Sequence, residues 1–519
     1  MNNLTPKLLI NNKKNQIIFF SFLIFSLILL FLGIPYTKWY FKTDDFGNIY
    51  HCFIKSYKDI IKFVYEGNIE HASHACNDLH DQHFLGGLYR PMSFIYYLPQ
   101  VFLFGTNAYG YFLITIILHA LNSVLLFLIF TKIISPIFSF LFTMYFAFHP
   151  TLIWLGWISA QTYFTEFLTL IFLLFFLKKY LDTNQIKFYL FSCVLFLMNI
   201  YLKEQTIVLP IWIIWATYIY KTFKLNSQKS VFTKLKVSLI LSSGYWLIIF
   251  FYLFTRALIF PIRVINTNTP TSLTFALNLH SFLNRQKERF FDFVTYIADF
   301  LNLSLLPKNH QIIKGSLIII LIIFLFILFI NSKNKIISLF LLFSILLFSW
   351  PALLIHYQPR YIYISLAFFI LLIIFLLKSQ KSTNLFAKYK KTIMCILSLT
   401  ICINATYLTI QLTAKEKLLN HIKISLMNLI KKDELQNAIT NNHALCFYNL
   451  PYYFRQGTAQ ATWMLTNKSN YPIYVYLTKP PISTIYKLGY NHIPNPKTVN
   501  KNILYITWDY DKSEFIFDY

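Results

Sequence analysis

Long apolar runs, separated by short polar stretches, make up most of the chain. The runs extend over about 15–25 residues, the length that an α-helix needs to cross the hydrocarbon core of a bilayer. They are continuous and do not alternate between apolar and polar positions as the strands of a membrane barrel do, so we expect helices. We predict about eleven transmembrane helices, at residues 17–36, 108–131, 134–150, 156–177, 186–202, 205–220, 237–256, 311–331, 336–352, 360–377 and 392–412.

The composition supports a chain that lies mainly in lipid. Hydrophobic residues make up 56% of the chain and charged residues only 13%, and the mean hydropathy is +0.53. A soluble protein of 519 residues could not bury that much apolar surface in its cores. The first run, at residues 17–34, exceeds the roughly 7–15 residues of a signal-peptide core, so we expect it to be retained as a helix.

The lysines indicate which side of the membrane each loop occupies. The net charge is +26, but the basic residues are spread over the loops between the spans, so we expect no nucleic-acid partner. With a cytoplasmic N-terminus every inner loop is basic, as the positive-inside rule requires; these loops carry Lys132, Lys178, Lys179, Lys187, Lys221, Lys224, Lys229, Lys234, Lys236, Lys333, Lys335, Lys378, Lys381, Lys388, Lys390 and Lys391. Residues 37–107, 257–310 and 413–519 then lie outside.

Two domains follow from this pattern. Residues 1–412 form a membrane domain with the large first outer loop 37–107, in which the apolar piece 92–104 is too short to cross and is expected to be an interfacial helix. Residues 413–519 begin with a basic helical stretch and then alternate apolar and polar positions, which indicates strands. The predicted fold class is an all-α polytopic membrane protein with a small C-terminal α/β extracytoplasmic domain.

The outer side of this topology gathers the polar residues that could carry chemistry. Ionisable groups at membrane depth are unfavourable by about 2.5–3.5 kcal/mol each, so they usually mark function. A carboxylate can take a proton from an acceptor hydroxyl, and cations can bind a phosphate. Alternatively, the acids begin a solvated loop, the cations are interface anchors and Lys203–Glu204 is a local ion pair. The candidate residues are Asp44, Asp45, Arg90, His149, Gln161, Lys203, Glu204, Arg256 and Arg360.

The order of short motifs resembles the type-C superfamily of integral-membrane glycosyltransferases, in its protein O-mannosyltransferase-like branch. The similarity is greatest to the transmembrane O-mannosyltransferases that carry tetratricopeptide repeats, although this chain shows no such repeat. The resemblance covers about residues 15–375. The matching elements are Asp44-Asp45, Tyr89-Arg90-Pro91, His149-Pro150 with Trp157-Ile158-Ser159, Lys203-Glu204 with Leu209-Pro210, Arg256, and Arg360-Tyr361-Ile362-Tyr363.

The resemblance implies transfer of a sugar, with inversion, from a polyprenyl-phosphate or dolichyl-phosphate donor on the non-cytoplasmic face. It implies Asp44 or Asp45 as the catalytic base, and Arg90, Lys203, Arg256 and Arg360 as donor-phosphate residues. Lys203 and Glu204 would act as a pair, and His149 and Gln161 would line the site. A repeat-free chain is similar in shape to bacterial inner-membrane enzymes whose site faces the periplasm. The acceptor, whether lipid, glycan or protein, stays open.

Other interpretations of the sequence also stay open. No cofactor is expected, although a His- and Asp-rich stretch at 71–83 could bind a divalent metal. Cys52 and Cys76 could form a disulfide in an oxidising outer compartment. The alternative functions are a glycan ligase or polymerase that uses lipid-linked chains, a transporter of lipid-linked sugars, and a membrane scaffold. Transporters often have two similar halves, and no duplicated half is detectable here.

Overall fold

The computed structural model describes part of the chain in detail. The described residues are 13–33, 91–152, 158–224, 230–259, 311–349, 359–379, 389–441, 443–448, 466, 473–476, 500–512 and 514–518. The His- and Asp-rich stretch 71–83 and the cysteines at 52 and 76 lie outside these residues. The metal and disulfide readings therefore stay predictions.

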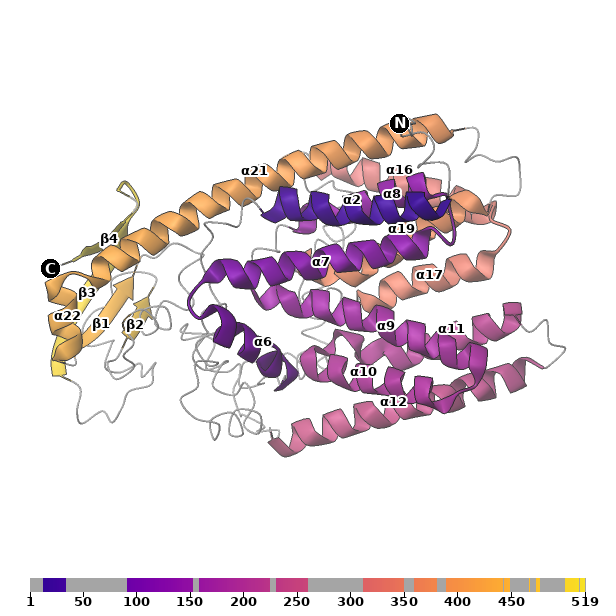
Figure 1. Ribbon diagram of the computed structural model, residues 1–519, viewed down its shortest axis with the longest axis horizontal. Coiled ribbons are helices and arrows are strands. Elements are labelled where there is room, and N and C mark those ends of the chain that lie inside the picture. Colours follow the sequence, from indigo (N-terminus) through magenta and orange to yellow (C-terminus); the bar gives the residue numbers. More distant parts are fainter. Residues whose placement is uncertain are drawn as a thin grey trace, which may run out of the picture.

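Helices dominate the described residues, and most lie along a similar axis (Figure 1). The short helix α6 (Pro91–Phe104) lies obliquely across this bundle (Figure 1). The others are α2 (Lys13–Gly33), α7 (Ala108–Phe130), α8 (Pro136–Ala147), α9 (Gln161–Thr183), α10 (Ile186–Leu202), α11 (Leu209–Lys224), α12 (Val231–Ile259), α16 (Gln311–Ile330), α17 (Lys335–Phe348), α19 (Tyr363–Lys378), α21 (Lys390–Ile430) and α22 (Asp433–Thr440). The part of the chain that the structure describes also contains the 3-10 helices η4 (Ile158–Ala160), η5 (Glu204–Val208) and η8 (Pro359–Ile362).

Several helices have the length and apolar character of membrane spans. Within the described residues, five are long and apolar enough to cross a membrane: Lys13–Gly33, Ala108–Phe130, Glu204–Phe223, Val231–Leu258 and Lys391–Ile430. Shorter apolar helices lie at Pro136–Ala147, Ile186–Leu202, Ser316–Ile330, Lys335–Phe348 and Tyr363–Lys378. Large apolar side chains such as Phe22, Phe232 and Phe250 are exposed on their surfaces, as lipid-facing positions are. These features are those of a helical membrane protein; the count of eleven spans stays a prediction.

Two glycines mark places where elements approach too closely for any side chain. A Cβ atom on Gly110 of α7 would collide with the ring of Phe104, and one on Gly244 of α12 would collide with the Tyr189 hydroxyl. That hydroxyl donates a hydrogen bond to the Leu241 carbonyl, 2.8 Å away, which ties α10 to α12. Small residues at helix contacts allow this close approach within membranes.

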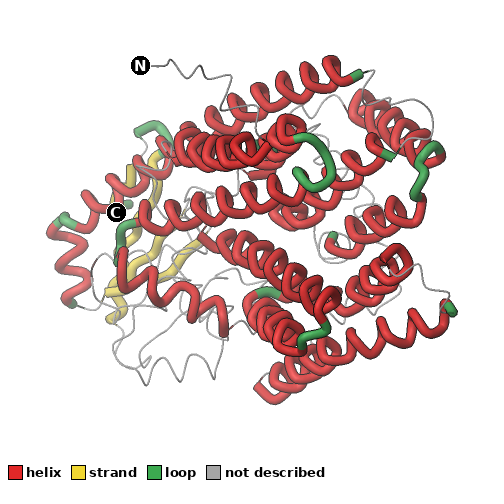
Figure 2. Tube along the Cα trace, turned by 45° about the vertical axis from the view of Figure 1, so that its right-hand side comes forward, coloured by secondary structure: helices red, strands yellow, loops and turns green. Residues whose placement is uncertain are grey.

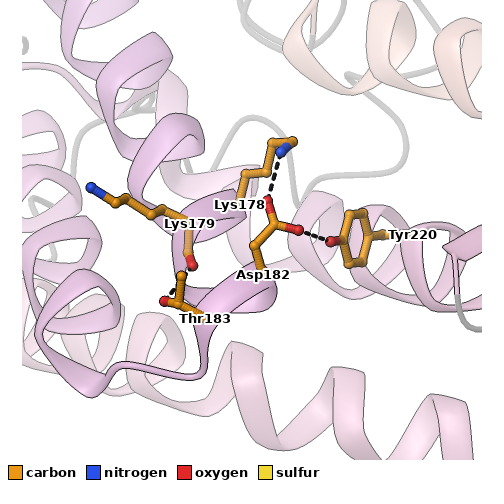
Figure 3. A network of polar contacts seen from close by, with 5 residues as sticks. All are labelled: Lys178, Lys179, Asp182, Thr183 and Tyr220. Atoms are coloured by element: carbon orange, nitrogen blue, oxygen red, sulfur yellow. Dashed lines mark hydrogen bonds and ion pairs between the residues drawn. The ribbon is translucent and has the colours of Figure 1, made fainter.

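The end of α9 that carries lysines is joined to α11 by a small polar network (Figure 3). Lys178 forms an ion pair with Asp182 at 2.7 Å, and Tyr220 of α11 donates a hydrogen bond to the same carboxylate. The Lys178 side chain is 67% exposed, so this ion pair contributes at most about 1 kcal/mol to stability. Asn184, in the left-handed conformation at φ 56°, ends α9 and allows the tight connection to α10.

Helix α21 is continuous across the predicted domain boundary at residues 412/413. Its 41 residues contain no glycine or proline, so nothing interrupts the helix. At 1.5 Å per residue it is about 60 Å long, roughly twice the hydrocarbon thickness. The predicted span 392–412 and most of the predicted basic helical stretch after it are therefore one helix, and α22 follows.

A four-stranded sheet packs on the far end of α21 (Figure 1), and Figure 2 shows the strands of this sheet in yellow. The strand order is β2-β1-β3-β4, with β1 (His443–Tyr448) parallel to β2 (Ile473–Tyr476) and β3 (Asn500–Asp509), and β4 (Glu514–Phe517) antiparallel to β3. Phe447, Trp508 and Phe515 are buried in this sheet, and the Phe515 amide donates to the Ser425 hydroxyl of α21 at 2.6 Å. This hydrogen bond joins the edge strand β4 to α21.

Candidate functional site

The predicted site residues divide into described and undescribed ones. Asp44, Asp45 and Arg90 lie outside the described residues, and for Arg360 only the backbone is described. The other five are described with their side chains: His149, Gln161, Lys203, Glu204 and Arg256. Each of these lies at or near the end of a helix.

Lys203 is buried where α10 ends. Its amide donates to the Asn199 carbonyl at 2.8 Å, and its backbone then becomes extended, which turns the chain into η5. The side chain is 6% exposed. Its ammonium lies over the ring of Tyr163 from α9, with Nζ 3.2 Å from the ring centroid. This is a close cation–π contact at a largely desolvated position.

Glu204, the next residue, contacts α12. The Tyr252 hydroxyl donates to Glu204 Oε1 at 3.2 Å. Arg256 lies four residues after Tyr252 in α12, on the same face of that helix. The Tyr201 and Thr255 hydroxyls, 2.8 Å apart, add a second link between α10 and α12. Glu204 is thus held against α12, whereas the ammonium of the preceding Lys203 lies against α9.

Gln205 joins the Lys203 turn to the segment that carries Arg360. Its Nε2 donates to the Phe348 carbonyl at 2.8 Å and to the Tyr361 carbonyl at 3.1 Å. The rings of Tyr163 and Tyr361 meet edge to face, with centroids 5.9 Å apart. Because Arg360 is bonded to Tyr361 within η8, its backbone lies beside the Lys203 turn.

Helix α6 docks on the same end of the bundle. The Ser93 hydroxyl donates to the carbonyl of Leu202, the residue before Lys203, at 3.1 Å. The Tyr97 hydroxyl donates to the Ile158 carbonyl in η4 at 3.0 Å. The polar side of α6 therefore faces the bundle, while Phe102 at 89% exposure faces away. The first residue of α6 is Pro91, which directly follows Arg90 in the chain.

Gln161 and His149 are buried but have mainly structural contacts among the described residues. Gln161 Nε2 donates to the Tyr111 carbonyl at 2.6 Å, which fixes the start of α9 against α7. The His149 ring lies against Tyr145, with centroids 5.6 Å apart, and its Nδ1 is 2.8 Å from the Thr151 hydroxyl. These contacts hold His149 within its own turn and do not link it to Lys203.

The sequence interpretation missed three residues of this region. Glu166 is fully buried on α9, one turn beyond Tyr163, and Asn199 of α10 donates to its carbonyl at 3.1 Å. A glutamate inside an apolar run was the available signal. Tyr163 and Tyr252 had no signal, because they are two of 36 tyrosines whose roles depend on partners far away in sequence.

No model of a protein family matches this chain, and no curated protein matches it. Among the described residues, no group of three or more His, Cys, Asp or Glu side chains could hold a metal ion. A buried ammonium, in a turn whose next residue carries a carboxylate, suits binding of an oxyanion at the membrane surface.

Proposed function

We propose that the protein is an integral-membrane glycosyltransferase. It would move a sugar from a polyprenyl-phosphate-linked donor to an acceptor on the non-cytoplasmic face, with inversion at the anomeric carbon. The observation that carries the proposal is the Lys203 turn: a buried ammonium, held over the Tyr163 ring, next to Glu204 and joined by Gln205 to the segment that contains Arg360. Burying ionisable groups in a membrane protein is energetically unfavourable, so such groups usually bind a charged partner.

The proposed topology has eleven crossing helices: α2, α7, α8, α9, α10, α11, α12, α16, α17, α19 and α21. The lysines at the end of α9 and before α17 would face the cytoplasm. The opposite helix ends, with the Lys203 turn, would then face outward, together with α6 and the C-terminal sheet. For a bacterial chain the outward side of the inner membrane is the periplasm.

Binding of the donor would use the cations. Lys203, Arg90, Arg256 and Arg360 would surround the phosphate, and Glu204 would orient Lys203. The connection of Arg90 to α6, whose Ser93 is bonded to Leu202, supports its placement near Lys203. Gln161 and His149 would line the site by fixing the helix ends around it.

The reaction would proceed by direct displacement. Asp44 or Asp45 would accept the proton of an acceptor hydroxyl while that oxygen forms a bond to the anomeric carbon. The bond between the anomeric carbon and the phosphate oxygen would break at the same time, and its electron pair would leave with polyprenyl phosphate. The cations would stabilise the charge that develops on this leaving group.

Mass spectrometry of glycans from cells lacking the protein tests the proposal. We expect one glycan to lose a single sugar, and expression of the wild-type chain to restore it. Asp44→Asn together with Asp45→Asn should fail to restore it, whereas Asp182→Asn, in the exposed network of Figure 3, should succeed at equal membrane level. Loss of whole preassembled chains would favour a ligase or polymerase. An unchanged glycan profile, or full complementation by the double Asp variant, would contradict the proposal.

A further inference from the structure

The contact between Lys203 and Tyr163 is unusual because a flexible, charged side chain is fixed by a buried ring. Tyr163 is 2% exposed, and the Lys203 ammonium lies 3.2 Å from its ring centroid. A lysine has four rotatable side-chain bonds and a strongly hydrated ammonium. Once the side chain is withdrawn from water, the negative face of an aromatic ring attracts the ammonium and restricts its position.

The ring itself is held in place from several directions. Its edge-to-face partner is Tyr361, whose carbonyl accepts a hydrogen bond from Gln205. The start of α9 is fixed by the bond from Gln161 to the Tyr111 carbonyl. Further along, Asn199 joins α10 to the Glu166 carbonyl on α9, one turn from each member of the pair. Contacts with η8, α7 and α10 therefore surround the ring in addition to Lys203.

We infer that Tyr163 is a positioning residue that presents the Lys203 ammonium to the phosphate of the lipid-linked donor. This inference rests on the proposed function and deepens it. The ring presents its π-face to the ammonium, so the lysine can keep donor hydrogens directed elsewhere. An oxyanion that binds the ammonium would meet a cation whose position the ring already restricts, which reduces the entropy lost on binding.

The ring and the hydroxyl of Tyr163 can be separated experimentally. Tyr163→Phe keeps the π-face, Tyr163→Leu removes it, and pentafluorophenylalanine at position 163 keeps the shape but reverses the charge distribution of the ring. The probe is a long-chain polyprenyl monophosphate without sugar, titrated onto the purified full chain in lipid nanodiscs. Tyr245→Leu is the matched control, because Tyr245 is also fully buried but contacts Ser192 on α10 instead of Lys203.

The expected pattern depends on the ring face. Tyr163→Phe should bind the probe within about twofold of wild type, whereas Tyr163→Leu and the pentafluoro variant should bind roughly tenfold more weakly. The KM for a sugar-loaded donor should rise in parallel, with a smaller change in kcat. Tyr245→Leu should bind the probe as wild type does. The pentafluoro variant keeps the volume of the ring, so it gives an answer even if Tyr163→Leu does not fold.

Lys203→Met distinguishes failure of this inference from failure of the proposed function. If Lys203→Met weakens binding of the probe but the pentafluoro variant does not, Tyr163 is not a positioning residue, and the proposed function stands. If Lys203→Met binds the polyprenyl monophosphate as tightly as wild type does, the phosphate role of Lys203 is wrong and the inference falls with it.

Discussion

His119 of α7 and Tyr363 of α19 share a hydrogen bond inside the helical bundle, with 2.8 Å between Nδ1 and the hydroxyl oxygen. His119 Nε2 is 3.1 Å from the Ala147 carbonyl, which can only accept, so we assign the proton to Nε2 and the acceptor role to Nδ1. The Tyr363 hydroxyl then donates to His119 and accepts from Asn122 at 3.3 Å. Both members of the bond are thereby satisfied.

This bond lies where α7, α8, α9 and α19 meet, at the first residue of α19. Asn122 also donates to the Phe164 carbonyl at 2.9 Å, and the Tyr363 ring packs against Phe146, Phe164 and Phe167 with centroids 5.0, 4.7 and 5.4 Å away. Because η8 directly precedes Tyr363, these contacts also hold the segment that carries Arg360.

Tyr363→Phe should therefore destabilise the bundle. The substitution removes one donor and leaves a buried imidazole nitrogen without it, so we expect a loss of about 1–2 kcal/mol in unfolding free energy. Denaturation in mixed micelles, followed by tryptophan fluorescence, measures the loss. Tyr510→Phe, at an exposed position beyond β3, is the control and should change nothing. Equal stability of the two variants would show that the His119–Tyr363 hydrogen bond does not stabilise the bundle.

Gly244→Ala tests the close approach of α10 and α12. The added Cβ would collide with the Tyr189 hydroxyl, whereas the nearest ring carbon would remain 3.3 Å away. We expect Gly244→Ala to destabilise the chain by about 1–3 kcal/mol and Tyr189→Phe to recover much of that loss in the double variant. Thermal unfolding of the four proteins in detergent measures the effect. A double variant less stable than either single variant would show that the clash is not the cause.

Lys203 and Glu166 should be energetically coupled. Helical side chains lean toward the N-terminus of their helix, so Glu166 leans toward the level of Tyr163, where the Lys203 ammonium lies. We expect Lys203→Met and Glu166→Gln, each measured alone and together, to show a coupling of roughly 1 kcal/mol or more in unfolding free energy. Additive effects within about 0.5 kcal/mol would mean that the two groups do not interact.

Tyr252→Phe tests whether Glu204 needs its hydrogen bond from α12. The variant loses the 3.2 Å bond to Oε1 while the ring packing on Tyr201 is retained. We expect a roughly tenfold fall in kcat/KM for sugar transfer, since an unanchored carboxylate no longer orients Lys203. Thr255→Val removes the neighbouring Tyr201–Thr255 bond in the same helix interface and serves as the control. A similar fall in both variants would indicate general loosening of α12.

Much of the helical architecture could be predicted from the apolar runs, but the details at helix ends could not. Helices α7 and α10 begin and end within two residues of the predicted spans because polar residues bound their runs. Helix α21 passes its predicted end because Ala and long aliphatic side chains continue the helix into the sheet contact. Glu204, expected just before a span, begins η5 instead, since the extended backbone of Lys203 interrupts the helices.

The candidate site could be predicted in its charges but not in its contacts. Lys203 and Glu204 are conspicuous in an apolar chain, so their position at a helix end could suggest a role. Tyr163 and Tyr361 could not be chosen from the sequence, because the ring contact between them joins segments far apart along the chain. Gln205 was in the same motif, but its two carbonyl partners, at Phe348 and Tyr361, depend on how α10, α17 and η8 pack.

Sugar transfer by the purified chain tests the proposed function most directly. The full-length protein, reconstituted in liposomes with a radiolabelled sugar on polyprenyl phosphate and a hydroxyl-bearing acceptor, should release polyprenyl phosphate and form a product of inverted anomeric configuration. Lys203→Met should raise the KM for the donor, and the chain with Asn at positions 44 and 45 should form no product. Product formation that is unaffected by these substitutions, or movement of the intact donor across the bilayer without transfer, would show that the proposed function is wrong.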